Sequence, residues 1–234
     1  MRRARPLRVA HIVLVGAFVG VMLLTSACGG SSQLQQQANQ AHSKLDQQLQ
    51  HAKSIGVPAS SLQTIIQQEQ KLNNSSAPFS WFNGDPDNTF YKNQTSSYQQ
   101  LLSSLQETVA IVTGQKQGEA QQALQAFEQK LTDQQAQKVG DTSAFAQRYT
   151  TDKHLLSLAT TPDNYLAITN DAVTATNALG LMASTYTQLA IFQNTISQMQ
   201  SANLDVTAMQ EQYKGDLGVF NSATAAKDFQ TLTT

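Results

Sequence analysis

The sequence predicts an all-α protein: an elongated antiparallel helical bundle or helix-hairpin array, preceded by an N-terminal signal peptide. From Gln33 onward the chain is rich in Gln, Ala, Ser and Thr and poor in Gly and Pro. Its apolar residues recur at spacings of three and four rather than alternating, which is the period of an α-helix. Gly56, Pro58, Gly140 and Pro162 fall between such stretches, where helices end or begin. These three observations exclude most β architectures.

The first 27 residues have the pattern of an export signal. An uncharged apolar run of thirteen residues, 12–24, follows four arginines: Arg2, Arg3, Arg5 and Arg8. A basic segment followed by a short apolar segment is typical of a signal peptide. The run is short for a membrane-spanning helix, which needs about 20 residues. We therefore predict that residues 1–27 form a cleaved signal peptide.

The segment Leu24-Thr25-Ser26-Ala27-Cys28 resembles the lipobox of bacterial lipoproteins, with Thr25 where that family usually has leucine. The resemblance covers residues 1–28 and implies that Cys28 carries a diacylglyceryl group after cleavage behind Ala27. Two acyl chains give durable anchoring to a membrane. Cys28 is the only cysteine of the chain, so an internal disulfide is excluded. Residues 28–33 are expected to form a flexible tether, and residues 34–234 the helical domain.

The predicted mature chain is mildly acidic. Removing residues 1–27 leaves eleven Lys and Arg against sixteen Asp and Glu, a formal net charge of −5. Nucleic-acid binding calls for clustered basic residues, so no nucleic-acid partner is expected. The expected membrane contact is the lipid anchor on the extracytoplasmic face, with a protein partner or a second copy of the chain left open.

The first predicted hairpin lies between residues 34 and 72. Its first helix has one apolar stripe, formed by Leu34, Ala38, Ala41, Leu45, Leu49 and Ala52. Gly56 is expected to end this helix in the left-handed conformation, and Pro58 to begin the next. This second helix carries Leu62, Ile65, Ile66 and Leu72 and is followed by a polar and aromatic loop, residues 73–89.

The rest of the chain is predicted to form further helices. One begins near Tyr91 and is expected to stop in a turn at Gly114 and Gly118, and the next is expected to close at Gly140. Asp141 or Thr142 can cap the helix after that. Residues 161–163, Thr-Pro-Asp, should open the longest helix, which reaches Met199 and spans about 60 Å.

One pattern occurs twice, 147 residues apart. Residues 54–57 with Leu62 are similar to residues 201–204 with Met209, and Asn203 takes the place of Gly56. Both residues tolerate positive φ, so both segments are predicted hairpin turns. We interpret them as repeat units that start near residues 34 and 180, with chance similarity in a Gln-rich chain as the alternative. The second unit stops at Thr234, which suggests a fragment of a longer chain.

The histidines and acids do not form a metal motif in the sequence. His42 and His51 lie nine residues apart, on opposite sides of a helix, so they cannot share a metal. His42 and Asp46 share a face and are interpreted as a solvated polar pair. A calcium-like alternation of oxygen ligands at Asn83, Asp85, Asp87 and Thr89 lacks the glycine and the glutamate that such a loop requires. No metal and no cofactor are therefore expected.

The aromatic loop is the candidate binding site. Its residues, Phe79, Trp81 and Phe82, and the adjacent Tyr91 could contact a glycan or a protein. The alternative is that they plug the end of the bundle, because large aromatic side chains are mostly buried.

No catalytic motif is recognisable, so we expect a non-enzymatic stalk, scaffold or interaction module of the cell envelope. One alternative is a ligand-binding lipoprotein that uses loop 79–91. Another is the N-terminal spacer of a longer cell-wall enzyme, because the chain weakly resembles the Gln-rich helical spacers before catalytic modules such as L,D-transpeptidases. That family's histidine-glycine-cysteine setting is not found in this sequence.

Overall fold

The computed structural model describes residues 31–76, 86–223 and 225–232, and every regular element in these ranges is an α-helix. This confirms the all-α class. The signal peptide, Cys28 and three aromatic residues of the loop, Phe79, Trp81 and Phe82, lie outside the described residues. None of the helices in this part of the chain combines the length and the hydropathy needed to cross a membrane. The helices are α1 (Ser31–Ser54), α2 (Ala59–Asn73), α3 (Pro86–Gln137), α4 (Ser143–Leu158), α5 (Pro162–Ser201), α6 (Thr207–Ser222) and α7 (Ala226–Gln230).

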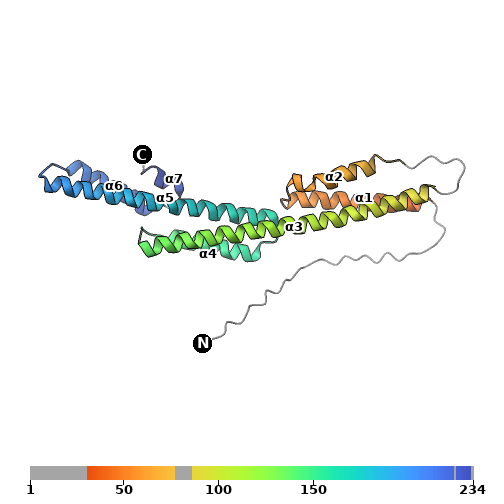
Figure 1. Ribbon diagram of the computed structural model, residues 1–234, viewed down its shortest axis with the longest axis horizontal. Coiled ribbons are helices and arrows are strands. Elements are labelled where there is room, and N and C mark those ends of the chain that lie inside the picture. The colour runs from red at the N-terminus through yellow and green to blue at the C-terminus, as the bar shows by residue number, and fades with distance from the viewer. Residues whose placement is uncertain (1–30, 77–85, 224, 233–234) are drawn as a thin grey trace, which may run out of the picture.

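The helices form a staggered, elongated array (Figure 1). The long helices α1, α3 and α5 run in one direction, and each is followed by a short helix that returns along it. Helix α3 packs against α1 and α2 and also against α4 and α5, and α5 continues beyond α3 to pack against α6 and α7. We call these three-helix groups unit A (α1, α2, α3), unit B (α3, α4, α5) and unit C (α5, α6, α7). Each of α3 and α5 thus belongs to two consecutive units.

Two hydrophobic clusters hold the array together. In unit A the predicted stripe of α1 is buried against α2 and α3, and its members include Leu45, Leu49, Leu62, Ile65, Tyr98 and Leu105. The second cluster runs through units B and C and includes Phe127, Phe145, Tyr165, Leu179, Met182, Phe220 and Phe229. Each large side chain removed from water contributes about 1.5–3 kcal/mol, which outweighs the weak helix propensity of the many Ser and Thr residues.

The two predicted hairpin turns are confirmed in detail. Gly56 has φ 87°, and the Val57 N–H donates to the Ala52 carbonyl at 3.0 Å. Asn203 has φ 59°, and the next N–H along the chain donates to the Met199 carbonyl at 3.0 Å. A left-handed residue followed by this backward hydrogen bond is the Schellman motif, which satisfies the last carbonyl groups of a helix.

The prediction of a turn at Gly114 and Gly118 was wrong, because α3 continues through both glycines. A Cβ atom added at either glycine would meet nothing within 4 Å, so neither marks a close approach of another segment. An interior glycine costs about 1 kcal/mol relative to alanine. Burial of Val112 before the glycines and of Ala120 after them outweighs that cost. With 52 residues, α3 rather than α5 is the longest helix, and it spans about 78 Å.

The predicted helix end at Gly140 was also wrong. Helix α3 ends at Gln137, and Lys138 takes the left-handed conformation with φ 54°. Gly140 has φ 144° and lies where a Cβ atom would come within 2.6 Å of Met182 Cε. Glycine at this position thus lets the backbone lie directly against the side chains of Met182 and Phe220.

The predicted starts of α4 and α5 agree with the structure, whereas α3 begins at Pro86, within the predicted loop, rather than near Tyr91. The Asp141 carboxylate accepts a hydrogen bond from the Ser143 N–H at 2.9 Å, at the start of α4. The Thr161 hydroxyl accepts from the Asn164 N–H at 3.3 Å, and Pro162 is the first residue of α5. Helix α1 begins at Ser31, so the last three residues of the expected tether, 31–33, are helical.

Candidate functional site

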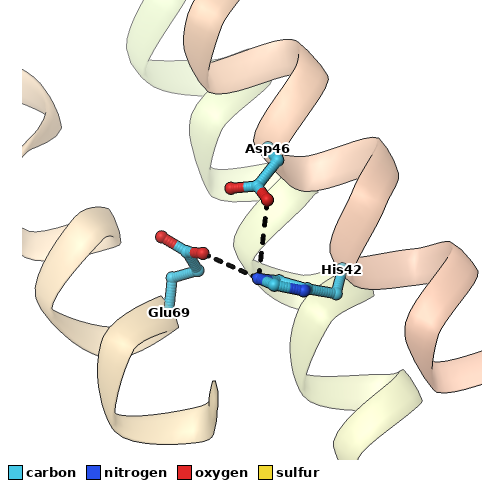
Figure 2. A group of neighbouring side chains, drawn as sticks. All are labelled: His42, Asp46 and Glu69. Carbon is cyan, nitrogen blue, oxygen red and sulfur yellow. Dashed lines mark hydrogen bonds and ion pairs between the residues drawn. The ribbon is translucent and has the colours of Figure 1, made fainter.

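In unit A, one histidine and two acids converge from α1 and α2 (Figure 2). His42 Nε2 lies 2.8 Å from Glu69 Oε1 and 3.7 Å from Asp46 Oδ2. The His42 ring packs on the buried ring of Tyr98, with 5.1 Å between centroids. Burial, and then the charge of Glu69, raises the pKa of Tyr98. The expected pair of His42 and Asp46 is therefore present, with Glu69 as a third member.

These three side chains are of the types that ligate zinc, and one ligand atom of each lies within 4.8 Å of the others. The His42–Glu69 contact already satisfies the Nε2 atom, and Asp46 is half exposed to solvent. The arrangement is explained by its structural effect, which is to fasten α2 to α1 through a polar contact.

The contribution of Glu69 escaped the sequence reasoning, although a signal for it exists. His42 and Glu69 lie fourteen and thirteen residues from the Gly56 turn, one on each side. Residues at equal distances from the turn of an antiparallel hairpin lie opposite each other. Glu69 is also a polar residue within the apolar series of α2, between Ile66 and Leu72.

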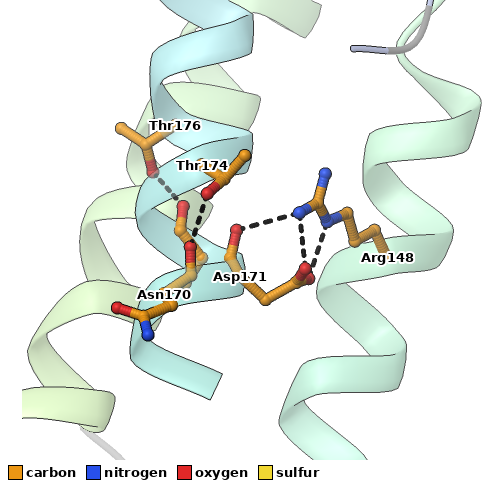
Figure 3. A network of polar contacts seen from close by, with 6 residues as sticks. Arg148, Asn170, Asp171, Thr174 and Thr176 are labelled. Atoms are coloured by element: carbon orange, nitrogen blue, oxygen red, sulfur yellow. Dashed lines mark hydrogen bonds and ion pairs between the residues drawn. The ribbon is translucent and has the colours of Figure 1, made fainter. Parts of the chain in front are cut away.

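In unit B, an arginine of α4 holds an aspartate of α5 (Figure 3). Arg148 Nε donates to Asp171 Oδ2 at 2.6 Å, and Nη2 donates both to the other carboxylate oxygen and, at 3.2 Å, to the main-chain carbonyl. Such a two-point pairing fixes the orientation of both groups. Close by on α5, the hydroxyls of Thr174 and Thr176 donate to main-chain carbonyls of their own helix and so take no part in the pair.

Asp152 lies one turn after Arg148 on α4, and it is the unusual member of this group. Its residue is 3% exposed, and its Oδ2 atom has no hydrogen-bond partner among the described residues. Burial and then the neighbouring Asp171 raise the pKa of Asp152 to about 7, while Arg148 opposes the rise. The hydrogen bonds from Arg148 lower the pKa of Asp171. Asp171 is thus ionised at neutral pH, whereas Asp152 is present in both its protonated and its ionised form.

An open groove of about 460 Å³ lies beside these acids, between the end of α4 and the start of α5. Its apolar lining includes Leu155 and Leu158, which are 46% and 63% exposed. The polar lining consists of Asp152, Asn164 and Asp171. Small-molecule sites have volumes of this order and combine apolar walls with a few polar groups. A pocket with a strongly shifted acid is a functional-site candidate on physical grounds.

The structure places one of the sequence-predicted binding residues. Tyr91 lies in the first turns of α3, half-buried, with its ring edge-to-face to Phe90 at 5.3 Å between centroids. Because the other loop aromatics lie outside the described residues, the aromatic binding site stays a prediction. The lipidation site at Cys28 stays a prediction for the same reason.

Asp152 and Asp171 of unit B were not predicted as site residues, although two features of the sequence indicate them. Asp152 occupies a helical core position, in the series Phe145, Tyr149, Asp152, Leu156. Arg148 and Asp171 lie twelve and eleven residues on either side of residue 160, in the turn between α4 and α5.

Comparison of the chain with protein-family models, with curated proteins and with solved structures gives no match.

Proposed function

We propose that this protein is a lipid-anchored lipoprotein of the cell envelope and acts as a stiff helical stalk or interaction module on the extracytoplasmic face. The lipobox resemblance at Cys28 and the signal-peptide pattern before it support the anchor. The observation that carries the stalk is the continuous helix α3, which unit A and unit B share. A continuous helix joins two units without a flexible linker, so the units keep a fixed separation.

The direction of the chain supports the same proposal. Helix α1 begins three residues after Cys28, at the end of the array formed by unit A, while unit C lies at the opposite end (Figure 1). A lipid on Cys28 would hold unit A at the membrane and hold unit C away from it. The net negative charge of the predicted mature chain disfavours lying flat on anionic lipid.

The test of the anchor is metabolic labelling of the complete precursor in a bacterial host with radioactive palmitate, together with the intact mass of the protein extracted in detergent. We expect label, and a mass equal to residues 28–234 plus the diacylglyceryl group, with or without an N-acyl chain. The control variant Cys28→Ser should take up no label and should retain residues 1–27. Equal labelling of both proteins, or a native protein without label, would overturn the proposal.

A further inference from the structure

We propose that the groove between α4 and α5 binds a small amphiphilic cation, an alkyl chain with one primary ammonium group. The ammonium group would contact Asp152, and the alkyl chain would lie along Leu155, Leu158 and Ile168. This site is independent of the lipid anchor and of the stalk.

The polar end of the groove is complementary to a ligand group that donates a hydrogen bond and carries a positive charge. Oδ2 of Asp152 is a buried acceptor without a partner among the described residues, and such an atom is costly until something donates to it. Arg148 already donates to both carboxylate oxygens and the carbonyl of Asp171. When Asp152 is ionised, two carboxylates therefore face one guanidinium group, which leaves one negative charge without a counter-charge. An ammonium group supplies both the donor and the charge.

The rest of the groove calls for hydrocarbon. Leu155, Leu158, Ala159, Ala167 and Ile168 line it, and the first two expose much of their side chains. Covering exposed leucine with an alkyl chain removes apolar surface of both partners from water, which is favourable. The groove volume of about 460 Å³ accommodates a chain of several carbons with a head group.

The proton equilibrium of Asp152 makes the site dependent on pH. The charged groups that act on Asp152 are Asp171 on α5 and Arg148 on its own helix, while Glu128 of α3 acts on Tyr149 instead. With a pKa of about 7, Asp152 is mostly protonated at pH 6 and ionised at pH 8. An alkylammonium group, like that of lysine, stays charged in this range. Its affinity should therefore rise about tenfold from pH 6 to pH 8, because binding requires the loss of the Asp152 proton.

The experiment is isothermal titration of the full chain carrying Cys28→Ser, which cannot be lipidated, with three eight-carbon probes: n-octylammonium, n-octanol and n-octanoate. We expect one octylammonium ion per chain, octanol binding about tenfold more weakly, and octanoate more weakly still, since a hydrogen bond to a charged group is worth about tenfold or more. Equal binding of all three probes would overturn the proposal, and so would no binding of octylammonium at millimolar concentration.

Variants separate the ammonium contact from general attraction to an acidic protein. Asp152→Asn should weaken octylammonium about tenfold and remove the pH dependence, while octanol binding stays unchanged. Asp133→Asn is the matched control, because it removes an exposed carboxylate of α3 that does not line the groove. An effect of the control as large as that of Asp152→Asn would overturn the proposal.

A variant at the rim keeps the test decisive if Asp152→Asn disturbs the fold. Leu158 is the more exposed of the two rim leucines, so Leu158→Ser leaves the core intact. It should weaken octylammonium and octanol by the same factor, because both place their chains there. Unchanged affinity of both probes in a folded Leu158→Ser protein would contradict the placement of the alkyl chain.

Discussion

Asp152, Glu69, Gln134 and Thr185 all occupy core-facing positions of helices whose other core residues are apolar. Gln134 and Thr185 are as buried as Asp152, and Glu69 is largely so. A buried polar group must find a partner in another helix or pay for its desolvation. Glu69 contacts His42, and Thr185 reaches the carbonyl of Phe229 at 3.5 Å. Gln134 Oε1 and Asp152 Oδ2 have no hydrogen-bond partner among the described residues, and of these two side chains only that of Asp152 can gain or lose a proton.

The titration of Asp152 should be detectable as a change in the stability of the protein with pH. The pKa of its carboxyl group is raised to about 7, above its ordinary value of 3.8, so the folded protein binds more protons than the unfolded chain between these values. The contribution of Asp152 to the free energy of unfolding therefore falls as the pH rises from 4 to 7. We expect Asp152→Asn to be more stable than the wild type at pH 8 by about 1–3 kcal/mol, with a smaller gain at pH 4.

Urea unfolding of both proteins at several pH values measures this difference. The lowered pKa of Asp171 acts in the opposite direction, with stability lost as pH falls below its ordinary range, but Asp171 is present in both proteins. A difference between the two proteins that is constant from pH 4 to pH 8 would contradict the assignment of the shifted carboxyl to Asp152.

The contact between α1 and α2 should depend on His42. His42→Ala removes the partner of the largely buried Glu69, so we expect a loss of about 1 kcal/mol in the free energy of unfolding at neutral pH. His51→Ala is the control, because His51 is exposed on the same helix. Thermal unfolding followed by circular dichroism compares them, and equal melting temperatures for the two variants would rule out a stabilising role for the contact.

At the scale of elements, glycines in these helices serve opposite purposes, and substitution should separate them. Gly114→Ala and Gly118→Ala should each stabilise the protein by about 0.5–1 kcal/mol, because the added methyl group meets nothing within 4 Å and α3 is continuous there. Gly56→Ala should destabilise it by more than about 1 kcal/mol, since φ is 87° and a Cβ atom would lie 1.8 Å from Asp163 Oδ1.

Chemical denaturation of the three single variants is the measurement. Destabilisation by Gly114→Ala would mean that α3 bends or opens at that point in solution, as the sequence alone had predicted.

The sequence was sufficient to predict helix ends that depend on one residue's conformation or one side chain. Gly56, Asn203, Asp141 and the Thr161-Pro162 pair belong to this kind. The sequence did not predict helix ends that depend on the burial of neighbouring residues. At Gly114 the helix continues because burial of the flanking turns outweighs the cost of a glycine. Lys138 is another such case, because no preference of lysine for positive φ marks the end of α3.

The site could be predicted only in part for a similar reason. Its acidic and basic residues lie on two helices, so their meeting depends on the register of a hairpin. That register follows from the turn once the turn is known. The burial of Asp152 follows from its place in the apolar series of α4. The groove itself depends on the distance between α4 and α5. Neither the position of the turn nor the apolar series of α4 predicts that distance.

For the whole molecule, the stiffness of the array should depend on the stretch of α3 between units A and B. Gln115→Pro places a proline in this exposed helical segment, where it costs about 3 kcal/mol and breaks the backbone hydrogen bonds. One further link joins the units, a hydrogen bond of 3.2 Å from the Asp163 N–H to the Ile55 carbonyl. We expect a bent or flexible particle in which both hydrophobic clusters persist.

Small-angle X-ray scattering of the Cys28→Ser protein with and without Gln115→Pro measures the maximum dimension, which should fall in the proline variant. Gln115→Ala is the matched control and should leave the scattering curve unchanged. An unchanged curve for the proline variant would show that contacts other than α3 hold the two units in line.

The sharing of α3 and α5 between units also limits how such a protein can be divided or lengthened. The two halves of α3 serve different units, because its core residues between 98 and 112 belong to the unit A cluster and those between 120 and 131 to the cluster of units B and C. A cut between residues 112 and 120 therefore leaves each product with its own core residues, but it removes the continuous helix that joins the units. Adding to the array, by contrast, takes one short helix and one long one, since the preceding long helix is already in place. The increment of growth is a hairpin, although the smallest group with a complete core has three helices.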